Sequence, residues 1–230
     1  GWIRGVLHDE GQMTVRAEMI RYEKLEGSCE EWRARFATAE PFPHLVIDEM
    51  FRSDLIRDAA RDFPSPSEMP EKPNRKGVLE LSDRRLVPPL LRQVSDELLG
   101  ERFTAWLSFV SGIDDLITDP DGNWGVLRQS GDGVEGKIHV PPSQHPNKPW
   151  YRRLTLILHL SEGLRGRNGG CFQLWDREKA APMVSVAPLF NRAVIFLNGS
   201  VAFHNASRTR LDAGQMRKIM QALYFIERAA

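Results

Sequence analysis

The sequence predicts a mainly β protein with supporting α-helices, built as a double-stranded β-helix, a cupin-like jelly roll. Eight short apolar segments separated by turn residues fill residues 124 to 227, a spacing typical of a β-sandwich or jelly roll. The first 123 residues instead show helical apolar periodicity. We therefore expect residues 1–230 to form a single domain, with 1–123 as mostly helical support and 124–227 as the β core.

The amino-terminal elements are predicted from apolar rhythm and from prolines that interrupt it. In order, we expect an amphipathic helix from about Met13 to Thr38 that is broken near Gly27, a short strand within 41–51, a helix from Ser53 or Asp54 through Phe63, an irregular loop over 64–77, and one or two helices within 88–113.

The carboxy-terminal strands are predicted from short apolar runs bounded by glycine, proline and polar turn residues. We expect strands at 124–130, 134–140, 153–160, 171–175, 183–187, 192–197, 201–204 and 217–227.

The charge balance and composition of the chain limit the kinds of molecule that it is expected to bind. The 31 basic and 31 acidic residues cancel, which removes a general electrostatic argument for nucleic acid or an anionic membrane and favours a small-molecule partner. No apolar run approaches the roughly 20 residues that span a bilayer. With Asp9 and Glu10 near its start, the chain lacks the order of a signal peptide, so we expect a cytoplasmic protein. Cys29 and Cys171 are expected to be reduced.

Two histidines far apart in the chain, His139 and His204, each end a predicted strand. A jelly roll that holds a metal does so between facing strands, so its ligands come from distant positions. Redox iron enzymes use two histidines and one carboxylate. The close pair is commonly His-X-Asp, because residues i and i+2 of a strand point to the same side, roughly 6 to 7 Å apart. Here the second residue after His139 is Pro141.

Four segments in fixed order carry a family resemblance: "GKIHVPPSQHPNKPWYRRLTLILHL" (136–160), "GGCFQLWD" (169–176), "VAPLFNRAVIFLNGSVAFHNASRTR" (186–210) and "GQMRKIMQALYF" (214–225). Together they resemble the 2-oxoglutarate and Fe(II)-dependent dioxygenases of the prolyl-hydroxylase-like branch. "PFPHLVIDEMF" (41–51) is similar to the segment that opens many such proteins.

The resemblance implies a cofactor set and a site. It implies that His139 and His204 bind Fe(II), and that Arg217 binds the distal carboxylate of 2-oxoglutarate, which suits a permanently charged guanidinium. Thr155 matches a position that often contacts the same cosubstrate. The implied activity is that of an oxidoreductase that uses molecular oxygen to oxidise, and in most cases hydroxylate, an unactivated C–H bond of a small molecule or amino-acid-type substrate.

Pro141 departs from the family pattern because it stands where Asp is usual and cannot ligate iron through its side chain. Glu135 has the strand parity of His139 but lies about 13 Å away along a strand. Gln144 or His145 would have to bend back to reach the metal. Three interpretations stay open: a hydroxylase with water or another side chain as third ligand, a halogenase with chloride in the vacated position, and a non-catalytic jelly-roll protein with a decayed metal site.

Other polar residues are interpreted as structural. His145, His159, Asn191 and Arg192 are expected in structural positions, and the glycine pair at 169–170 is expected to form a turn or bulge. The residues that select the substrate are expected in the helical part and in the loops 64–77 and 112–123.

Overall fold

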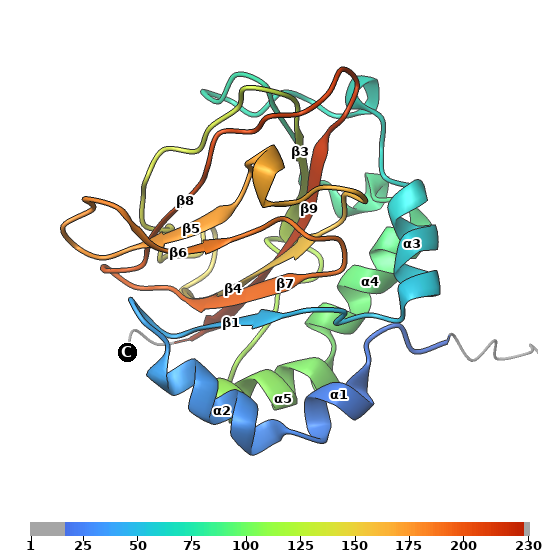
Figure 1. Ribbon diagram of the computed structural model, residues 1–230. Coiled ribbons are helices and arrows are strands. Elements are labelled where there is room, and N and C mark those ends of the chain that lie inside the picture. The colour runs from blue at the N-terminus through green and yellow to red at the C-terminus, as the bar shows by residue number, and fades with distance from the viewer. Residues whose placement is uncertain (1–16, 228–230) are drawn as a thin grey trace, which may run out of the picture.

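The computed structural model describes residues 17–227, which form two antiparallel sheets and a layer of helices (Figure 1). The major sheet has six strands in the order β1-β7-β4-β9-β3-β2, and the minor sheet has three in the order β6-β5-β8. In Figure 1 the helices lie along one side of the major sheet and the minor sheet lies over its other side. The expected beginning of the first helix, at Met13, lies outside the described residues.

The helices of this part of the chain are α1 (Tyr22–Glu26), α2 (Cys29–Thr38), α3 (Ser53–Arg61), α4 (Pro89–Leu99) and α5 (Glu101–Ser111), with single 3-10 turns at Pro66–Glu68, Arg84–Leu86 and Gly166–Asn168. The strands are β1 (His44–Ile47), β2 (Val78–Leu81), β3 (Gly125–Ser130), β4 (Tyr151–His159), β5 (Phe172–Trp175), β6 (Pro182–Val186), β7 (Ala193–Leu197), β8 (Phe203–Ala206) and β9 (Arg217–Ile226).

The helix boundaries follow from local chemistry. Pro89 opens α4 at its first position, where a proline needs no hydrogen-bond partner for its missing N–H. Gly100 has an extended backbone between α4 and α5, so the segment predicted to form one or two helices forms two. Gly112 then ends α5 in the left-handed conformation with φ of 67°.

Strand β4 explains why the major sheet has two buried faces. Leu154, Leu156 and Leu158 pack into a core shared with the helices, whereas Ile157 packs into a second core between the two sheets. Alternate residues of a strand point to opposite faces, so a continuous apolar run is required where both faces are covered. The helix-side core contains residues from Met19 to Tyr224, which means that both halves of the chain contribute to it.

Two features differ from the sequence-based expectation. Strand β2 was not predicted, and together with β1 it brings two strands from the first 123 residues to opposite edges of the major sheet. The segment 134–140, predicted as a strand, has only one isolated bridge, at His139, because its ladder toward 204–209 is irregular.

The cysteines and the membrane-spanning potential can also be compared with the sequence-based expectation. Cys29 and Cys171 are free thiols, as predicted. Within residues 17–227 no helix has the length and apolar character needed to cross a membrane.

Candidate active site

His139 and His204 are cross-strand neighbours. Their backbones form an antiparallel bridge in which His139 N–H donates to the carbonyl of His204 at 3.1 Å and His204 N–H donates back at 2.9 Å. Residues paired in this way point to the same face. The two imidazole centroids are 4.4 Å apart. The histidines are thus adjacent along one edge of the minor sheet, which differs from the expected meeting across facing strands.

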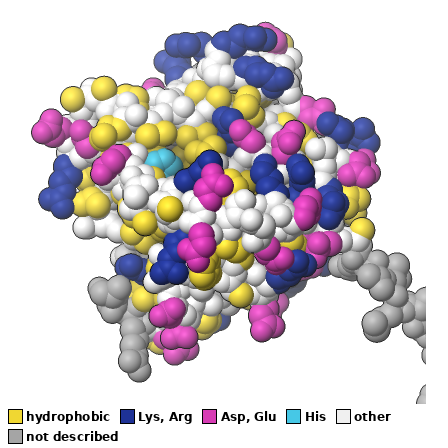
Figure 2. Space-filling model, turned by 60° about the horizontal axis from the view of Figure 1, so that its bottom comes forward, with side chains coloured by type: hydrophobic (Ala, Val, Ile, Leu, Met, Phe, Trp, Pro, Cys, Tyr) yellow, Lys and Arg dark blue, Asp and Glu magenta, His cyan; other side chains and the backbone are white. Residues whose placement is uncertain are grey.

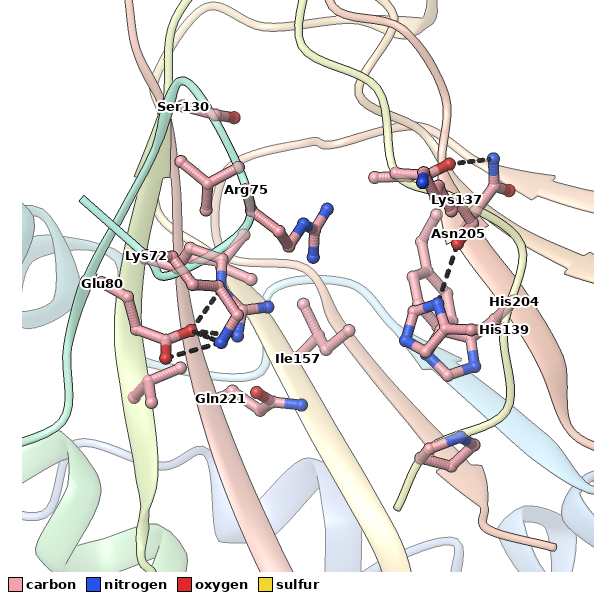
Figure 3. Close-up of a pocket in the computed structure, with 18 of the residues that line it drawn as sticks. Lys72, Arg75, Glu80, Ser130, Lys137, His139, Ile157, His204, Asn205 and Gln221 are labelled. Carbon is pink, nitrogen blue, oxygen red and sulfur yellow. Dashed lines mark hydrogen bonds and ion pairs between the residues drawn. The ribbon is translucent and has the colours of Figure 1, made fainter.

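In both imidazoles Nδ1 is hydrogen-bonded to a backbone carbonyl, which leaves Nε2 with its lone pair. Nδ1 of His139 lies 2.8 Å from the carbonyl oxygen of Lys137, and Nδ1 of His204 lies 3.0 Å from that of Ala202. A carbonyl oxygen only accepts, so each Nδ1 carries the proton and each Nε2 keeps its lone pair. Figure 3 shows the two rings side by side with the hydrogen bond to Lys137. This is the donor arrangement that a metal-binding histidine pair requires.

The segment before His139 is fixed against β8 by backbone contacts that need a glycine. Gly136 N–H donates to the carbonyl of Ala206 at 2.8 Å, and the Asn205 amide donates to the Gly136 carbonyl at 3.1 Å. A Cβ on Gly136 would lie 2.9 Å from the Ala206 nitrogen. The glycine three residues before His139 therefore lets the two backbones approach, which holds the imidazole pair in register.

His204 stands on the inner, drier side of the pair. Its ring lies 5.3 Å from the ring of Phe172 and 4.9 Å from that of Phe196. Burial lowers the pKa of His204 to about 4, although its hydrogen bond to Ala202 acts in the opposite direction. The ring is therefore neutral at pH 7, which is the protonation state that binds a metal ion.

A cavity of about 710 Å³ opens in front of the histidine pair, and Pro141 and Arg217 also line it. Pro141 offers no donor atom at this wall. Among residues 17–227, no group of three His, Cys, Asp or Glu side chains is arranged to hold a metal. His145, considered as a substitute, is buried elsewhere with Nε2 2.8 Å from the Asp119 carboxylate. The described residues thus place two imidazoles together at the cavity and group no carboxylate with them.

Arg217 is buried at the beginning of β9, and Gly170 fixes it. Its Nε donates to the Gly170 carbonyl at 2.8 Å, and a Cβ on Gly170 would lie 2.5 Å from Cδ of Arg217. Burial, with a smaller effect of Arg128, lowers the pKa of Arg217 to about 10, so the guanidinium is still charged at pH 7. Within residues 17–227 it forms no ion pair. The glycine turn predicted at 169–170 therefore supports the arginine.

Thr155 and His159 lie on the face of β4 that carries Ile157, but neither lines the cavity. The Thr155 hydroxyl is buried and donates to the Asn198 side chain at 3.1 Å. Both ring nitrogens of His159 are buried without a partner in the described part of the chain. Burial, then Arg217 and Arg192, lowers the pKa of His159 well below its ordinary value. A cosubstrate contact for Thr155 stays a prediction.

Asn191 has the structural role expected of it. Its φ is 61°, and its side chain accepts from the N–H of Phe51 at 2.9 Å and donates to the Phe51 carbonyl at 2.8 Å. Arg192, also expected to be structural, pairs with Asp48. Lys137 and Arg208 are both exposed, but only Lys137 lines the cavity.

Sequence reasoning did not single out three arginines that line the same cavity: Arg75, Arg128 and Arg152. Arg128 and Arg152 were detectable in principle, because each is a charged residue within a strand that is otherwise largely apolar. Arg75 belongs to the loop predicted at 64–77, and only the fold brings it to the cavity.

Comparison with known proteins agrees with this geometry. Residues 125–226 match the 2OG-Fe(II) oxygenase superfamily. Its members are oxidoreductases that use Fe(II) and 2-oxoglutarate, so the resemblance noted from the sequence is confirmed. A search of curated proteins finds no match.

Solved structures show the same fold. A prolyl-4-hydroxylase from Pseudomonas putida superposes with a TM-score of 0.60 at 15% identity, covering 89% of this chain and 100% of that one. A prolyl hydroxylase from Trichoplax adhaerens, in complex with a hypoxia inducible factor oxygen degradation domain peptide fragment, gives 0.62 at 14% identity, with coverage of 90% and 92%. HygX from Streptomyces hygroscopicus, with nickel and 2-oxoglutarate bound, gives 0.54 at 13% identity, with coverage of 80% and 82%. The predicted double-stranded β-helix is confirmed.

Proposed function

We propose that the protein is an Fe(II)- and 2-oxoglutarate-dependent oxygenase that oxidises an unactivated C–H bond, with hydroxylation as its reaction. The observation that carries this proposal is the pairing of His139 with His204, each with Nε2 available, in the cavity that Arg217 also lines. Fe(II) bound there with 2-oxoglutarate supplies the chemistry of the superfamily, in which dioxygen is activated as 2-oxoglutarate is converted to succinate and carbon dioxide.

The donor set suits a borderline metal ion such as Fe(II). Imidazole is a common ligand for iron, and the carbonyl oxygens of Lys137 and Ala202 fix the tautomer and orientation of the rings. The neutral state of His204 at pH 7 leaves it ready to bind. In this proposal His139 and His204 hold the ion through Nε2, and Pro141 leaves a ligand position to water or another small ligand.

Arg217 suits a carboxylate ligand for electrostatic reasons. It is a buried cation whose one side-chain hydrogen bond within residues 17–227 goes to a neutral carbonyl, so a carboxylate would satisfy donors that Gly170 leaves unused. A guanidinium can pair with a carboxylate through two parallel hydrogen bonds. We assign to it the distal carboxylate of 2-oxoglutarate, while Phe172 and Phe196 exclude water from the inner side of the histidine pair.

Several finer predictions accompany the proposal. A small-molecule or amino-acid-type substrate and a cytoplasmic location stay predictions. The single domain over residues 1–230 also stays a prediction, and its support is the helix-side core, which takes described residues from both halves of the chain.

Succinate formation tests the proposal. The purified protein is supplied with Fe(II), 2-oxoglutarate and oxygen, and succinate is measured for the wild type, His204→Ala and Arg217→Met. The wild type is expected to release succinate even without its substrate, at a slow uncoupled rate. His204→Ala is expected to lose this activity, and Arg217→Met to require more 2-oxoglutarate. Equal succinate release from all three proteins would contradict the proposal.

A second candidate is a halogenase, and the wall at Pro141 favours it. The cavity has no carboxylate ligand in that position and is rich in cations, so a chloride ion bound to the metal would find a favourable potential. Product analysis with and without chloride separates the two reactions, because a chlorinated product is expected only for the halogenase. If the purified protein neither retains iron nor melts at a higher temperature with Fe(II) and 2-oxoglutarate, both reactions are excluded in favour of a non-catalytic binding protein.

A further inference from the structure

The cavity in front of the histidine pair is strongly cationic. Seven lysine and arginine side chains line it, against two glutamates, in a protein whose total charge is zero. On the face drawn in Figure 2, basic and acidic side chains lie next to one another over much of the surface. The excess of positive charge is therefore a local property of the cavity.

Arg128 of β3 lies close to the other arginines of the cavity. It pairs with Ile219 of β9, and Arg217 is the next residue on the same face, so the two arginines are diagonal neighbours. The positive charge of Arg128 contributes to lowering the pKa of Arg75 and of Arg152, in each case after the larger effect of burial. Four guanidiniums thus lie within electrostatic reach of one another.

Among residues 17–227, a single carboxylate forms an ion pair with this cluster. Glu80 pairs with Arg128 and also accepts from Lys72 at 2.7 and 2.8 Å. Arg75 and Arg152 form no ion pair and donate no side-chain hydrogen bond within residues 17–227, and Nε of Arg152 is buried without a partner. A partly buried cation without a partner lowers the stability of the free protein, and such unpaired charge is typical of a group that binds a ligand.

Arg75 reaches toward the histidine pair from the opposite side of the cavity. In Figure 3 its guanidinium lies between Lys72 and Glu80 on one side and His139 and His204 on the other. A Cβ built on Gly136 would lie 3.5 Å from an Arg75 terminal nitrogen, so the arginine ends close to the segment that leads to His139. An anion that contacts Arg75 would therefore lie near the proposed metal ion.

2-Oxoglutarate alone does not account for these charges. Bound as a dianion, it would balance the two charges of Fe(II) and would occupy Arg217, leaving Arg75 and Arg152 still unpaired. We propose that Arg75 and Arg152 bind an anionic group of the oxidised substrate, a carboxylate or a phosphate, in the same cavity. This inference rests on the proposed function and deepens it by assigning the substrate to the class of small organic anions.

Binding of small anions to the loaded protein tests the inference. The protein is saturated with Zn(II), which has no redox chemistry, and with 2-oxoglutarate in the absence of oxygen. Calorimetric titrations then use N-acetylglycine as a carboxylate, N-acetylglycinamide as its neutral twin, and methyl phosphate as a phosphate monoester. One of the two anions is expected to bind while 2-oxoglutarate stays bound, and the neutral twin is not. Which anion binds more tightly distinguishes a carboxylate from a phosphate.

Two substitutions and a matched control make the test specific. Arg75→Met and Arg152→Met are each expected to weaken anion binding about tenfold or more, the effect of losing a charge-assisted hydrogen bond. Arg152→Met is also expected to raise the melting temperature of the ligand-free protein, because it removes an unpaired, partly buried charge whose Nε is fully buried. Arg177→Met, at an exposed arginine between β5 and β6, is the control and is expected to change neither property.

The outcomes separate this inference from the proposed function. Anion binding that is absent, that displaces 2-oxoglutarate, or that is unchanged in both variants would overturn the inference while leaving the oxygenase proposal intact. If 2-oxoglutarate does not bind but the anions do, and bind through Arg75 and Arg152, the anion site stands and the oxygenase proposal falls. A melting temperature lowered by Arg152→Met would show that this arginine has a structural role instead.

Discussion

Replacing Gly170 with alanine should displace Arg217 without replacing any charged residue. Gly170 has φ of 62°, and the alanine Cβ would lie 2.5 Å from Cδ and 3.0 Å from Nε of Arg217. The arginine must then move, because atoms at these separations overlap. Its hydrogen bond to the Gly170 carbonyl, now 2.8 Å long, is expected to break or lengthen.

The expected loss of stability has two parts. A left-handed backbone costs a non-glycine residue about 1–2 kcal/mol. Displacing a buried charged donor from its acceptor costs about 1–3 kcal/mol more. Gly163 separates these parts, because its φ is 79° and a Cβ there would meet nothing within 4 Å. Gly163→Ala should therefore lower the free energy of unfolding by the first part only, and Gly170→Ala by both.

Chemical unfolding and 2-oxoglutarate titration of the two variants provide the assay. Gly170→Ala is expected to be about 1–3 kcal/mol less stable than Gly163→Ala. It should also bind 2-oxoglutarate at least about tenfold more weakly, since a displaced guanidinium loses its pairing with the distal carboxylate. If both variants bind 2-oxoglutarate with the affinity of the wild type, then Arg217 does not hold this ligand in the position that Gly170 imposes.

Three further predictions follow from single contacts. Pro141→Asp places a carboxylate two residues after His139, where it can act as a third ligand. The amount of iron that the protein retains through dialysis should therefore rise, and unchanged retention would show that position 141 does not reach the ion. Asn191→Ala leaves the Phe51 backbone groups unpaired and should cost about 2–4 kcal/mol in denaturant unfolding with unchanged metal content. Burial raises the pKa of Asp119, but its hydrogen-bond partners, Lys148 foremost, lower this pKa by more, so the net shift is downward. The ionised Asp119 carboxylate therefore stabilises the folded protein above about pH 4, and this stabilisation is lost as the pH falls further. Stability of Asp119→Asn should accordingly depend less on pH in that range than that of the wild type.

The sequence was a good guide wherever structure follows from local pattern. The apolar run around Ile157 predicted β4, and Pro88 and Pro89 marked the beginning of α4, because these signals depend only on near neighbours. Strand β2 escaped prediction because its short segment follows a proline-rich loop and is defined by pairing with β3, where Glu80 faces Arg128. Such long-range pairing leaves no local signature.

The site was predicted in its residue types but not in its arrangement. His139, His204 and Arg217 were expected near one cavity and do line it. The hydrogen bonds that fix the imidazole tautomers depend on the backbone conformation of each histidine, which the sequence does not state. The place of Arg75 depends on how a proline-rich loop folds back over the sheet, and so the cationic character of the cavity became visible only in three dimensions.

The central claim is that His139 and His204 share one metal ion, and His44 provides a matched control for it. His44 also has its Nδ1 next to the carbonyl two residues earlier, at 2.8 Å from Phe42, but it is not bridged to a second histidine. Oxygen-free calorimetric titration with Fe(II) should give one bound ion for the wild type and for His44→Ala, and no measurable binding for His139→Ala or His204→Ala. Equal iron binding by all four proteins would contradict the claim.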